Sequence, residues 1–259
     1  MAKFLNKPIV IKIGGSTFGS GDTAIEDLVT LQKEGRSLVV VHGGANVVTE
    51  WLSRLGIATK IVDGLRATTD LQTLQVVVAV LCGTVNKKIV ADIQSRGGQA
   101  MGLSGIDGRL IEAKVKNEQR GYMGEVVKIN PEPVETLLKE GYIPVVAPSG
   151  FGVEEAMPLN VNADPAAGAL AAALGAERLI LLTDVVGVMD GAGELWHRLS
   201  PAEARSLIAS GVVAGGMIPK VEACLTALAT VPVTQIVDGR TPHALVEAIA
   251  GKGSGTIIA

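Results

Sequence analysis

The stretch that decides the fold is Ile9–Gly15, with the sequence Ile-Val-Ile-Lys-Ile-Gly-Gly. Its β-branched side chains favour a strand, and they fall on both of the faces that alternate along a strand. A strand that is apolar on both faces is typical of a parallel sheet with helices on either side. Lys12 is the exception within this apolar run, and two glycines follow the strand directly.

Other short apolar runs repeat this pattern, at Leu38–Val41, Ile143–Ala147, Leu179–Leu182 and Val233–Val237. Between them lie helix starts in which a capping side chain precedes a proline, at Asn130-Pro131, Asp164-Pro165, Ser200-Pro201 and Thr241-Pro242. Gly141 and Gly251 predict helix ends. The alternation of strands and helices predicts an α/β fold with a mostly parallel, helix-covered sheet.

Two segments depart from this alternation. Leu110–Val115 and Tyr122–Lys128 predict an antiparallel hairpin at the edge of the sheet. Asp70–Gln94 is a long and very apolar helical segment with Gly83 inside it. So much aliphatic surface indicates burial against the sheet or at a subunit interface, and the sequence leaves both open.

The composition of the 259 residues excludes several classes of protein. With 47% hydrophobic and 19% charged residues, the chain does not have the composition of a disordered protein. A net charge of −3 and 3% aromatic residues argue against a nucleic-acid-binding surface. Apolar runs such as Val76–Cys82 are much shorter than the ~20 residues of a membrane-spanning helix. Met1–Lys7 show no leader pattern, so we expect a cytoplasmic protein without a membrane partner.

Cysteine and histidine, which are frequent metal ligands, are few and scattered in this chain. Cys82 and Cys224 lie in apolar helical surroundings, and we expect them to be buried, reduced thiols. The three histidines form no ligand spacing, so the sequence predicts no metal ligand.

Five motifs fall at strand ends or helix starts, where parallel sheets bind ligands. Lys12 would cost free energy if it were buried without a partner or ligand, and Gly14 and Gly15 allow backbone N–H groups to approach a phosphate. The second motif, His42–Asn46, joins a strand to a helix start and predicts another anion-binding turn. Neither motif is a Walker A or Rossmann fingerprint, which argues against P-loop NTPases and nicotinamide dehydrogenases.

The third and fourth motifs carry an arginine and an aspartate. Arg66, within Asp63–Thr69, offers a planar fork for a carboxylate, although a solvated surface arginine would look the same. In Asn160–Asp164, the aspartate is explained as a helix N-cap. That explanation leaves Asn160 and Asn162 without a role.

The fifth motif is Gly215–Lys220, which places Lys220 in the first turn of a predicted helix. A cation there opposes the helix dipole by roughly 0.3–1 kcal/mol. A lysine retained in this position indicates an anion to bind.

In their order and spacing, the five motifs resemble the amino-acid kinase family. Leu181–Val188 and Val237–His243 extend the resemblance over essentially the whole chain. The resemblance implies a three-layer α/β/α sandwich with a mostly parallel central sheet, as a single domain over residues 1–259. It further implies an acyl-substrate lobe over about 1–158 and a nucleotide lobe over about 159–259.

Within the family, the motifs are most similar to members that phosphorylate N-acetyl-L-glutamate in arginine biosynthesis, with ATP and Mg²⁺. The resemblance implies that the γ-carboxylate is the acceptor and that an acyl phosphate is the product. Lys12 and Lys220 would hold the transferring phosphoryl group, and Asp164 would orient both lysines.

The resemblance also assigns binding residues. The implied residues for N-acetyl-L-glutamate are Gly43, Gly44, Ala45, Arg66 and Asn160. The implied residues for the nucleotide are Gly14, Gly15, Thr183, Asp184, Val185, Val186, Gly187, Val188, Val212, Val213 and Ala214. The chain departs from the family pattern at Ala45, where a third glycine is frequent, and at Asp63, where asparagine is frequent.

Other functions remain open. Sibling enzymes are glutamate 5-kinase, aspartokinase, UMP kinase and an aminoadipate kinase acting on a carrier-bound substrate; Arg66 and the uncharged Met217–Pro219 favour N-acetyl-L-glutamate over these. A non-catalytic sensor with the same fold would lack Lys12, Asp164 or Lys220, and all three are present.

The assembly is predicted by comparison with arginine-inhibited family members, which carry an extra amino-terminal helix that links dimers into a hexamer. Met1–Lys7 are too few for such a helix. We therefore expect a homodimer that arginine does not inhibit, with Leu74–Leu81 as the candidate interface. Core burial of Leu74–Leu81 is the alternative.

Overall fold

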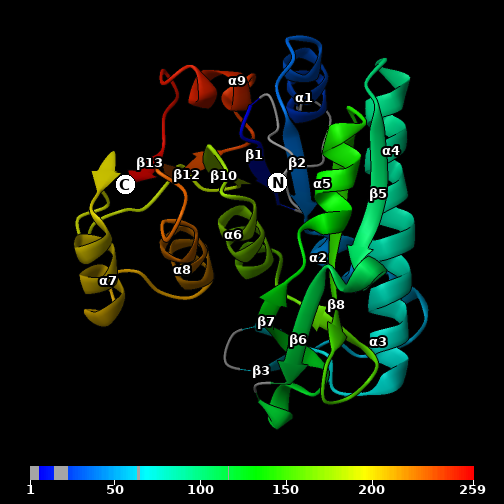
Figure 1. Ribbon diagram of the computed structural model, residues 1–259. Coiled ribbons are helices and arrows are strands. Elements are labelled where there is room, and N and C mark those ends of the chain that lie inside the picture. Colours follow the sequence, from blue (N-terminus) through cyan, green and yellow to red (C-terminus); the bar gives the residue numbers. More distant parts are fainter. Residues whose placement is uncertain (1–5, 15–22, 63–64, 116) are drawn as a thin grey trace.

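The computed structural model describes residues 6–14, 23–62, 65–115 and 117–259, with the side chains of Leu65 and Arg66 left out. Gly15 and Asp63 therefore lie outside the described residues. One sheet of eleven strands runs through this part of the chain (Figure 1). Its strands are β1 (Ile9–Ile13), β2 (Leu38–His42), β5 (Ala100–Gly105), β6 (Ile111–Val115), β7 (Met123–Ile129), β8 (Ile143–Gly152), β9 (Pro158–Val161), β10 (Arg178–Thr183), β11 (Arg198–Leu199), β12 (Thr234–Asp238) and β13 (Thr256–Ile258).

The helices of the described residues are distributed along the whole chain. They are α1 (Ala24–Lys33), α2 (Ala45–Arg54), α3 (Leu71–Val78), the π-helical η1 (Ala79–Val85), α4 (Asn86–Ser95), α5 (Glu132–Lys139), α6 (Ala163–Leu174), α7 (Pro201–Ala209), α8 (Met217–Ala227) and α9 (Ala244–Ile249). Two short 3₁₀ turns lie at Asp107–Arg109 and Glu118–Arg120, and β3 (Lys60–Val62) and β4 (Leu65–Ala67) form a separate small hairpin. None of these helices is long and apolar enough to cross a bilayer.

The centre of the sheet is parallel. β1 lies between β10 and β2, β12 pairs with β10, and β8 pairs with β2 and β5, all in parallel. The five strands predicted from apolar runs are all present, within one residue at the amino end and within five at the carboxyl end. The prediction of a mostly parallel sheet is therefore confirmed.

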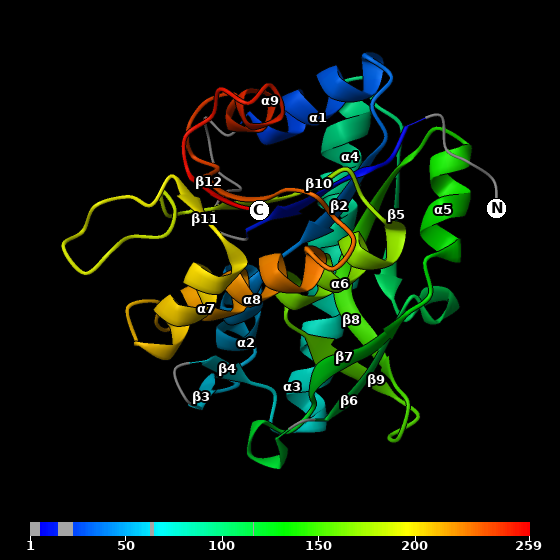
Figure 2. The same cartoon turned by 60° about the vertical axis from the view of Figure 1, so that its left-hand side comes forward.

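Both faces of the sheet are buried by helices, as the alternation within β1 shows. Ile9, Ile11 and Ile13 join the apolar cluster that includes α1, α2, the helical run from α3 through η1 to α4, and α9. Val10 points to the opposite cluster, which includes α6, α7 and α8. Figures 1 and 2 show these two helical layers on either side of the sheet. The three-layer α/β/α architecture is confirmed. The sheet is continuous across residue 158, so the division into two lobes stays a prediction.

The predicted hairpin is also present. β6 and β7 pair in antiparallel fashion, with Ile111 opposite Ile129. β6 joins the end of β8, and β7 joins β9, which itself returns to β8. The four strand segments therefore close on one another at the end of the sheet that is opposite β11.

The long apolar segment forms one continuous helical run, α3–η1–α4, which starts with the Asp70 side chain accepting a hydrogen bond from the Thr73 N–H at 2.8 Å. Its aliphatic side chains Leu74, Val77, Val80 and Leu81 are at most 5% exposed. The structure thus favours the core-burial alternative for most of this stretch.

Two of the predicted helix starts are wrong. Asp164 is not an N-cap: Asn162 is the cap of α6, and its side chain accepts a hydrogen bond from the Asp164 N–H at 3.0 Å. Thr241-Pro242 lies in a turn, and α9 begins only at Ala244, after His243 in the left-handed conformation. The Ser200 cap is confirmed as a capping box with Glu203. Pro165 is the third residue of α6, and Pro242 lies in the turn before α9, so neither proline is the first residue of its helix.

The cysteines match the expectation of free thiols. Cys82 is half-buried and Cys224 is buried, and neither forms a disulfide. Burial raises the pKa of Cys224 to about 12, which keeps the thiol protonated.

Helices α6 and α8 approach each other closely at one glycine. A Cβ atom at Gly168 would lie 2.5 Å from the carbonyl oxygen and 2.9 Å from the Cα atom of Ala223. Both atoms of Ala223 belong to the backbone, so they cannot rotate away as a side chain could. Gly168 therefore sets the distance between the two helices that begin with Asp164 and Lys220 in their first turns.

We expect Gly168→Ala to lower the melting temperature, because the added methyl group must push α6 away from α8. Overpacking of this kind costs about 1–3 kcal/mol. Gly191→Ala is the control, since a Cβ atom there meets nothing within 4 Å. A melting temperature for Gly168→Ala equal to that of the control would contradict the close approach.

The end of β2 carries a buried histidine. His42 is 0% exposed, and its Nδ1 lies 2.7 Å from the carbonyl oxygen of Gly43. Burial lowers the pKa of His42 to about 4. The imidazole is therefore neutral at physiological pH.

This histidine makes stability depend on pH. Between pH 4 and about 6.5, the unfolded chain binds a proton at His42 and the folded chain does not, so the free energy of unfolding falls as the pH falls. The full loss on acidification to pH 4 is about 3 kcal/mol. We expect urea titrations at pH 6.5, 5.5 and 4.5 to show a shallower decline for His42→Asn than for the wild type. Equal declines of the free energy of unfolding in the wild type and in His42→Asn would indicate that the His42 imidazole is exposed to solvent.

Candidate active site

The predicted motifs meet at the carboxyl ends of the parallel strands. Ile13 pairs with His42 on β2 and with Leu182 on β10, and Thr183 pairs with Asp238 on β12. The turns that follow these strands therefore share one edge of the sheet. This is the edge at which open α/β sheets bind their ligands.

Lys12, Asp164 and Lys220 form a buried cluster at this edge. Lys12 Nζ lies 2.7 Å from Asp164 Oδ1, and Lys220 Nζ lies 3.0 Å from Asp164 Oδ2. The side chains of the three residues are 8%, 6% and 16% exposed, respectively. One carboxylate thus bridges two ammonium groups that come from β1 and α8, far apart in the sequence.

The local structure explains why these side chains converge. Lys12 lies two residues after Val10, so it points to the same face of β1, where α6 and α8 pack. Asp164 and Lys220 each lie in the first turn of a helix. Gly168 permits the close approach of these two helices.

The electrostatics of the cluster favour an anionic ligand. Burial lowers the pKa of Lys12, and the charge of Asp164 opposes this effect. Burial alone would raise the pKa of Asp164, but the charges of Lys12 and Lys220 outweigh it and hold that pKa below its ordinary value. Asp164 is therefore ionised. With both lysines charged, Lys12, Asp164 and Lys220 together carry a net charge of +1, and the charge of the nearby Asp184 also acts on Lys12.

A cavity of about 220 Å³ lies over this cluster. Its lining consists of Lys12, Gly14, Ala45, Asn46, Thr183, Asp184 and Lys220. Ala45 and Asn46 are the first residues of α2. The N–H groups at a helix start have no acceptor within the helix, so they are available to an anion. Two lysines and a helix N-terminus around one small cavity are the features of a phosphate site.

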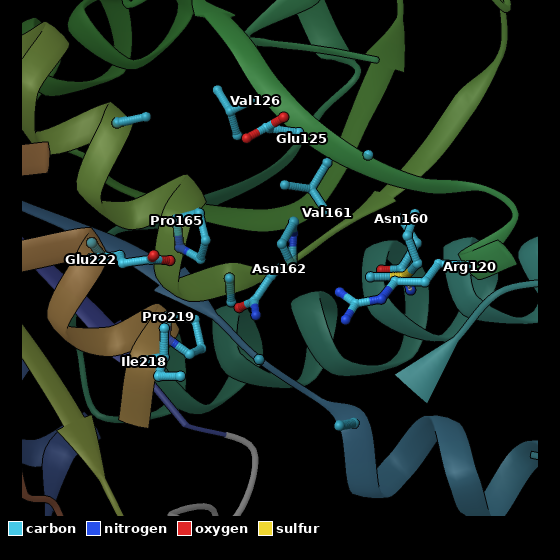
Figure 3. Close-up of a pocket in the computed structure, with 18 of the residues that line it drawn as sticks. Arg120, Glu125, Val126, Asn160, Val161, Asn162, Pro165, Ile218, Pro219 and Glu222 are labelled. Carbon is cyan, nitrogen blue, oxygen red and sulfur yellow. Dashed lines mark hydrogen bonds between the residues drawn. The ribbon is translucent and has the colours of Figure 1, made fainter. Parts of the chain in front are cut away.

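A larger cavity of about 1550 Å³ adjoins Lys12 and opens between α6, α8, β7 and β9 (Figure 3). Gly43, Gly44 and Ala45 contribute to its lining, as does Asn160. The volume exceeds the roughly 300–1,000 Å³ of typical small-molecule sites. It therefore has room for more than one small ligand.

Asn160 is held in a fixed orientation within this cavity. Its Nδ2 donates to Thr68 Oγ1 at 2.9 Å and lies 3.2 Å from Met123 Sδ. The residue is 8% exposed. Because the amide nitrogen is engaged in these contacts, the oxygen of Asn160 faces a different direction and can accept a hydrogen bond from a ligand.

The structure brings together ten of the nineteen predicted site residues. They line the two cavities or form the charged cluster: Lys12, Gly14, Gly43, Gly44, Ala45, Asn160, Asp164, Thr183, Asp184 and Lys220. Gly15 and the side chain of Arg66 lie outside the described residues, although the backbone of Arg66 belongs to β4.

The remaining predicted nucleotide residues line neither cavity. Val188 and Val213 are at most 3% exposed and belong to the hydrophobic core, so their side chains do not face a ligand. Gly187 is also buried. Val185, Val186 and Val212 are 37%, 39% and 42% exposed, and Ala214 is also exposed.

Sequence reasoning missed several residues of the larger cavity. Arg120 lies in the turn before β7, and Met123 is the first residue of β7. Figure 3 shows the Arg120 side chain close to Asn160. This turn is attached to Thr68, the residue directly after β4: the Thr68 N–H donates to the Arg120 carbonyl at 3.2 Å, and the Tyr122 N–H donates to the Thr68 carbonyl at 2.7 Å. The turn is not at the end of a parallel strand, so no motif pointed to it.

Asn162 and Asn46 were also missed as cavity residues, although both lie within predicted motifs. Among the described residues, no group of three or more histidine, cysteine, aspartate or glutamate side chains could hold a metal ion. Both carboxylate oxygens of Asp164 already face lysines. Asp184, which lines the small cavity, could contribute a carboxylate to a metal ion there, and the remaining ligands would come from the bound nucleotide.

Comparison with known proteins agrees with this geometry. The model of the amino acid kinase family matches residues 7–237. An acetylglutamate kinase of Dehalococcoides mccartyi is 41% identical, with 100% of this chain and 96% of the relative covered. Acetylglutamate kinases of Rhizorhabdus wittichii and Prochlorococcus marinus are 44% and 45% identical, over 100% and 99% of this chain and 91% and 86% of the relatives.

Solved structures share the fold. The protein smu.665 of Streptococcus mutans has a TM-score of 0.82 at 29% identity, with 97% of this chain and 98% of that chain covered. N-acetylglutamate synthase of Neisseria gonorrhoeae has a TM-score of 0.83 at 24% identity, over 98% of this chain and 59% of that chain. Carbamate kinase of Giardia lamblia has a TM-score of 0.70 at 17% identity, with 98% of each chain covered. From the family match and the full-length relatives, the chain belongs to the amino acid kinase family.

Proposed function

We propose that the protein transfers the γ-phosphoryl group of ATP to the γ-carboxylate of N-acetyl-L-glutamate, a step of arginine biosynthesis. The observation that carries this proposal is the bridge from Asp164 to Lys12 and Lys220, which prepares two cations for a phosphoryl group. The full-length similarity to acetylglutamate kinases supports the choice of acceptor.

The reaction needs positioning and charge neutralisation more than covalent chemistry. The acceptor carboxylate has a reference pKa of about 4.3, so it is ionised at neutral pH and needs no general base. Lys12 and Lys220 neutralise charge on the transferring group, and Asp164 holds both ammonium groups in place. An oxygen of the acceptor attacks the γ-phosphorus, the bond from phosphorus to the bridging oxygen of ADP breaks, and the acyl phosphate forms.

ATP fits the small cavity through its phosphates. Lys12, Lys220 and the N–H groups of Ala45 and Asn46 would face the phosphate oxygens, whereas the Gly14 N–H donates to the Leu182 carbonyl at 3.0 Å. The exposed valines Val185, Val186 and Val212 offer apolar surface for the base. Mg²⁺, when it is bound, neutralises phosphate charge, and the donor set of the site fits a metal ion that arrives on the nucleotide.

The acceptor fits the adjoining part of the large cavity. Gly43, Gly44 and Ala45 would flank its reacting end, and the oxygen of Asn160 would accept a hydrogen bond from the amide N–H of the acetylated amine. We assign the α-carboxylate to Arg66, whose backbone lies in β4 beside Thr68. In this arrangement the acceptor lies between the β3–β4 hairpin and Lys12.

The proposal is tested by trapping the acyl phosphate with hydroxylamine, in reactions with ATP, Mg²⁺ and one acceptor at a time. We expect rapid product formation with N-acetyl-L-glutamate and little with glutamate, aspartate or UMP. Turnover with any of these competitors that equals or exceeds turnover with N-acetyl-L-glutamate would overturn the assignment of the acceptor.

Replacement of Lys220 tests its role at the phosphoryl group. We expect Lys220→Ala to lower kcat on the order of 10²–10³-fold, while the affinity for ATP changes little. Lys139→Ala, at an exposed lysine of α5, is the control. A near-normal kcat for Lys220→Ala would show that this lysine only neutralises Asp164.

Replacement of Arg66 tests the acceptor pocket. Lysine keeps the positive charge but lacks the planar pair of donors that binds a carboxylate. We expect Arg66→Lys to raise the KM for N-acetyl-L-glutamate at least 10-fold, the equivalent of about 1.4 kcal/mol, with little change in the KM for ATP. Equal increases for both substrates would indicate a role of Arg66 in folding.

We also propose a cytoplasmic homodimer, because ATP is supplied in the cytoplasm and the long helix retains some exposed small and aliphatic surface. Leu74, Val77 and Leu81 are buried within the protomer, so an interface there would use Val76, Val78 and Ala79. Light scattering should give the mass of two chains, with or without arginine. A hexamer or a monomer would contradict the prediction.

A further inference from the structure

A chain of buried polar contacts runs behind the turn that follows β2. Lys87 Nζ lies 3.1 Å from Asn86 Oδ1, Asn86 Nδ2 lies 3.2 Å from His42 Nε2, and His42 Nδ1 lies 2.7 Å from the Gly43 carbonyl oxygen. Asn86 and His42 are each 0% exposed. The chain of contacts thus connects an exposed lysine with the glycines that flank the proposed reacting groups.

The orientation of the Asn86 amide is set by its neighbours. An ammonium group can only donate hydrogen bonds, so the atom of Asn86 that faces Lys87 must be the oxygen. Lys87 is itself anchored by the Gly102 carbonyl at 3.2 Å. A Cβ atom at Gly102 would overlap with Asn86 Oδ1, so the glycine leaves the space that this orientation needs. Nδ2 then donates to the Val145 carbonyl at 2.8 Å and points to His42 Nε2 at 3.2 Å, with the Leu103 carbonyl farther away at 3.4 Å.

The orientation of Asn86 determines the tautomer of His42. Because Asn86 presents an N–H group to Nε2, that nitrogen must accept and cannot carry a proton. In a neutral imidazole the single proton then resides on Nδ1. Nδ1–H donates to the Gly43 carbonyl, which it contacts at 2.7 Å.

The Gly43 carbonyl in turn determines where the next N–H points. In a trans peptide the C=O of Gly43 and the N–H of Gly44 lie in one plane and point in opposite directions. The carbonyl faces His42, on the buried side of the turn, whereas Gly43 and Gly44 line the large cavity. Holding the carbonyl therefore aims the Gly44 N–H toward the cavity.

The π-helical segment η1 also packs against this turn. A Cβ atom at Gly44 would lie 2.7 Å from the side chain of Leu81 and 3.2 Å from that of Val85. Asn86 is the first residue after η1. One stretch of the long helix thus packs against Gly44 and also supplies the amide for His42. π-Helical turns inside α-helices are frequent at functional sites.

We propose that Lys87, Asn86 and His42 form a relay that positions the Gly43–Gly44 peptide, so that the Gly44 N–H donates to the phosphoryl group during transfer. The inference rests on the proposed function, and its three residues are positioning residues that do not touch substrate. A donor held in place before the reaction stabilises developing charge without reorganisation. The relay therefore affects kcat more than KM.

The first test is spectroscopic and needs no substrate. In the wild type, ¹⁵N NMR should show a protonated Nδ1 and an unprotonated Nε2 for His42. In Asn86→Asp, where an acceptor replaces the N–H donor, Nε2 should gain a proton. A protonated Nε2 in the wild type, or an unchanged ring in Asn86→Asp, would overturn the relay.

The second test is kinetic and uses neighbouring lysines as a matched pair. Loss of one hydrogen bond in the relay should lower the kcat of Lys87→Met about 5-fold, with both KM values within about 2-fold of the wild type. Lys88→Met removes an exposed pair with Asp92 and should leave kcat unchanged. Equal kcat values for the two variants would overturn a role of Lys87.

The third test asks whether the Nδ1 donor alone is needed. Asparagine carries an N–H donor near the position of Nδ1, whereas leucine fills the space without one. We expect His42→Leu to lower kcat on the order of 10–100-fold and His42→Asn to recover most of that loss. Equal losses in both variants would indicate that the ring only fills space. If the wild type fails to phosphorylate N-acetyl-L-glutamate, the proposed function fails, and the NMR result still decides on the relay.

Discussion

The active site depends on one carboxylate, that of Asp164, which bridges two ammonium groups in buried surroundings. Without Asp164, Lys12 and Lys220 would repel each other in surroundings that exclude most water, and burial already lowers the pKa of Lys12. Burying charges is expensive unless they are paired with good geometry. Here each lysine faces a different oxygen of Asp164, so that both contacts form together.

The rest of the fold can be understood as the frame for this bridge. The parallel strands bring Lys12 and the glycine turns to one edge, and α6 and α8 deliver Asp164 and Lys220 to it. Gly168 permits the close helix contact on which their separation depends. The site needs no general base because the acceptor carboxylate is already ionised at neutral pH, and the net positive charge of the cluster stabilises charge that the substrates bring.

Much of this arrangement could be predicted from the sequence, because the strands and their glycine turns are local patterns. The apolar runs gave the sheet, and Lys12 within such a run indicated a ligand. The local Asp-Pro pattern misassigned Asp164 as a cap, and only the family resemblance linked it to Lys12 and Lys220, which lie 152 and 56 residues away in sequence. Arg120 and Met123 were missed for a related reason: only tertiary pairing between β7 and β9 brings them beside Asn160. Contacts between residues far apart in the chain produce no local motif that could be recognised in the sequence.

The measurement that tests the central claim most directly is the single-turnover rate of acyl phosphate formation in Asp164→Asn, together with its affinity for ATP. Asparagine keeps the shape of the side chain but raises the net charge of the cluster from +1 to +2. If charge alone drove the reaction, transfer would be as fast or faster. Because Asp164 positions the two lysines, we expect the rate to fall on the order of 10²–10³-fold, while ATP binds at least as tightly as it does to the wild type. A rate equal to that of the wild type, in a variant with an unchanged circular dichroism spectrum, would contradict the account.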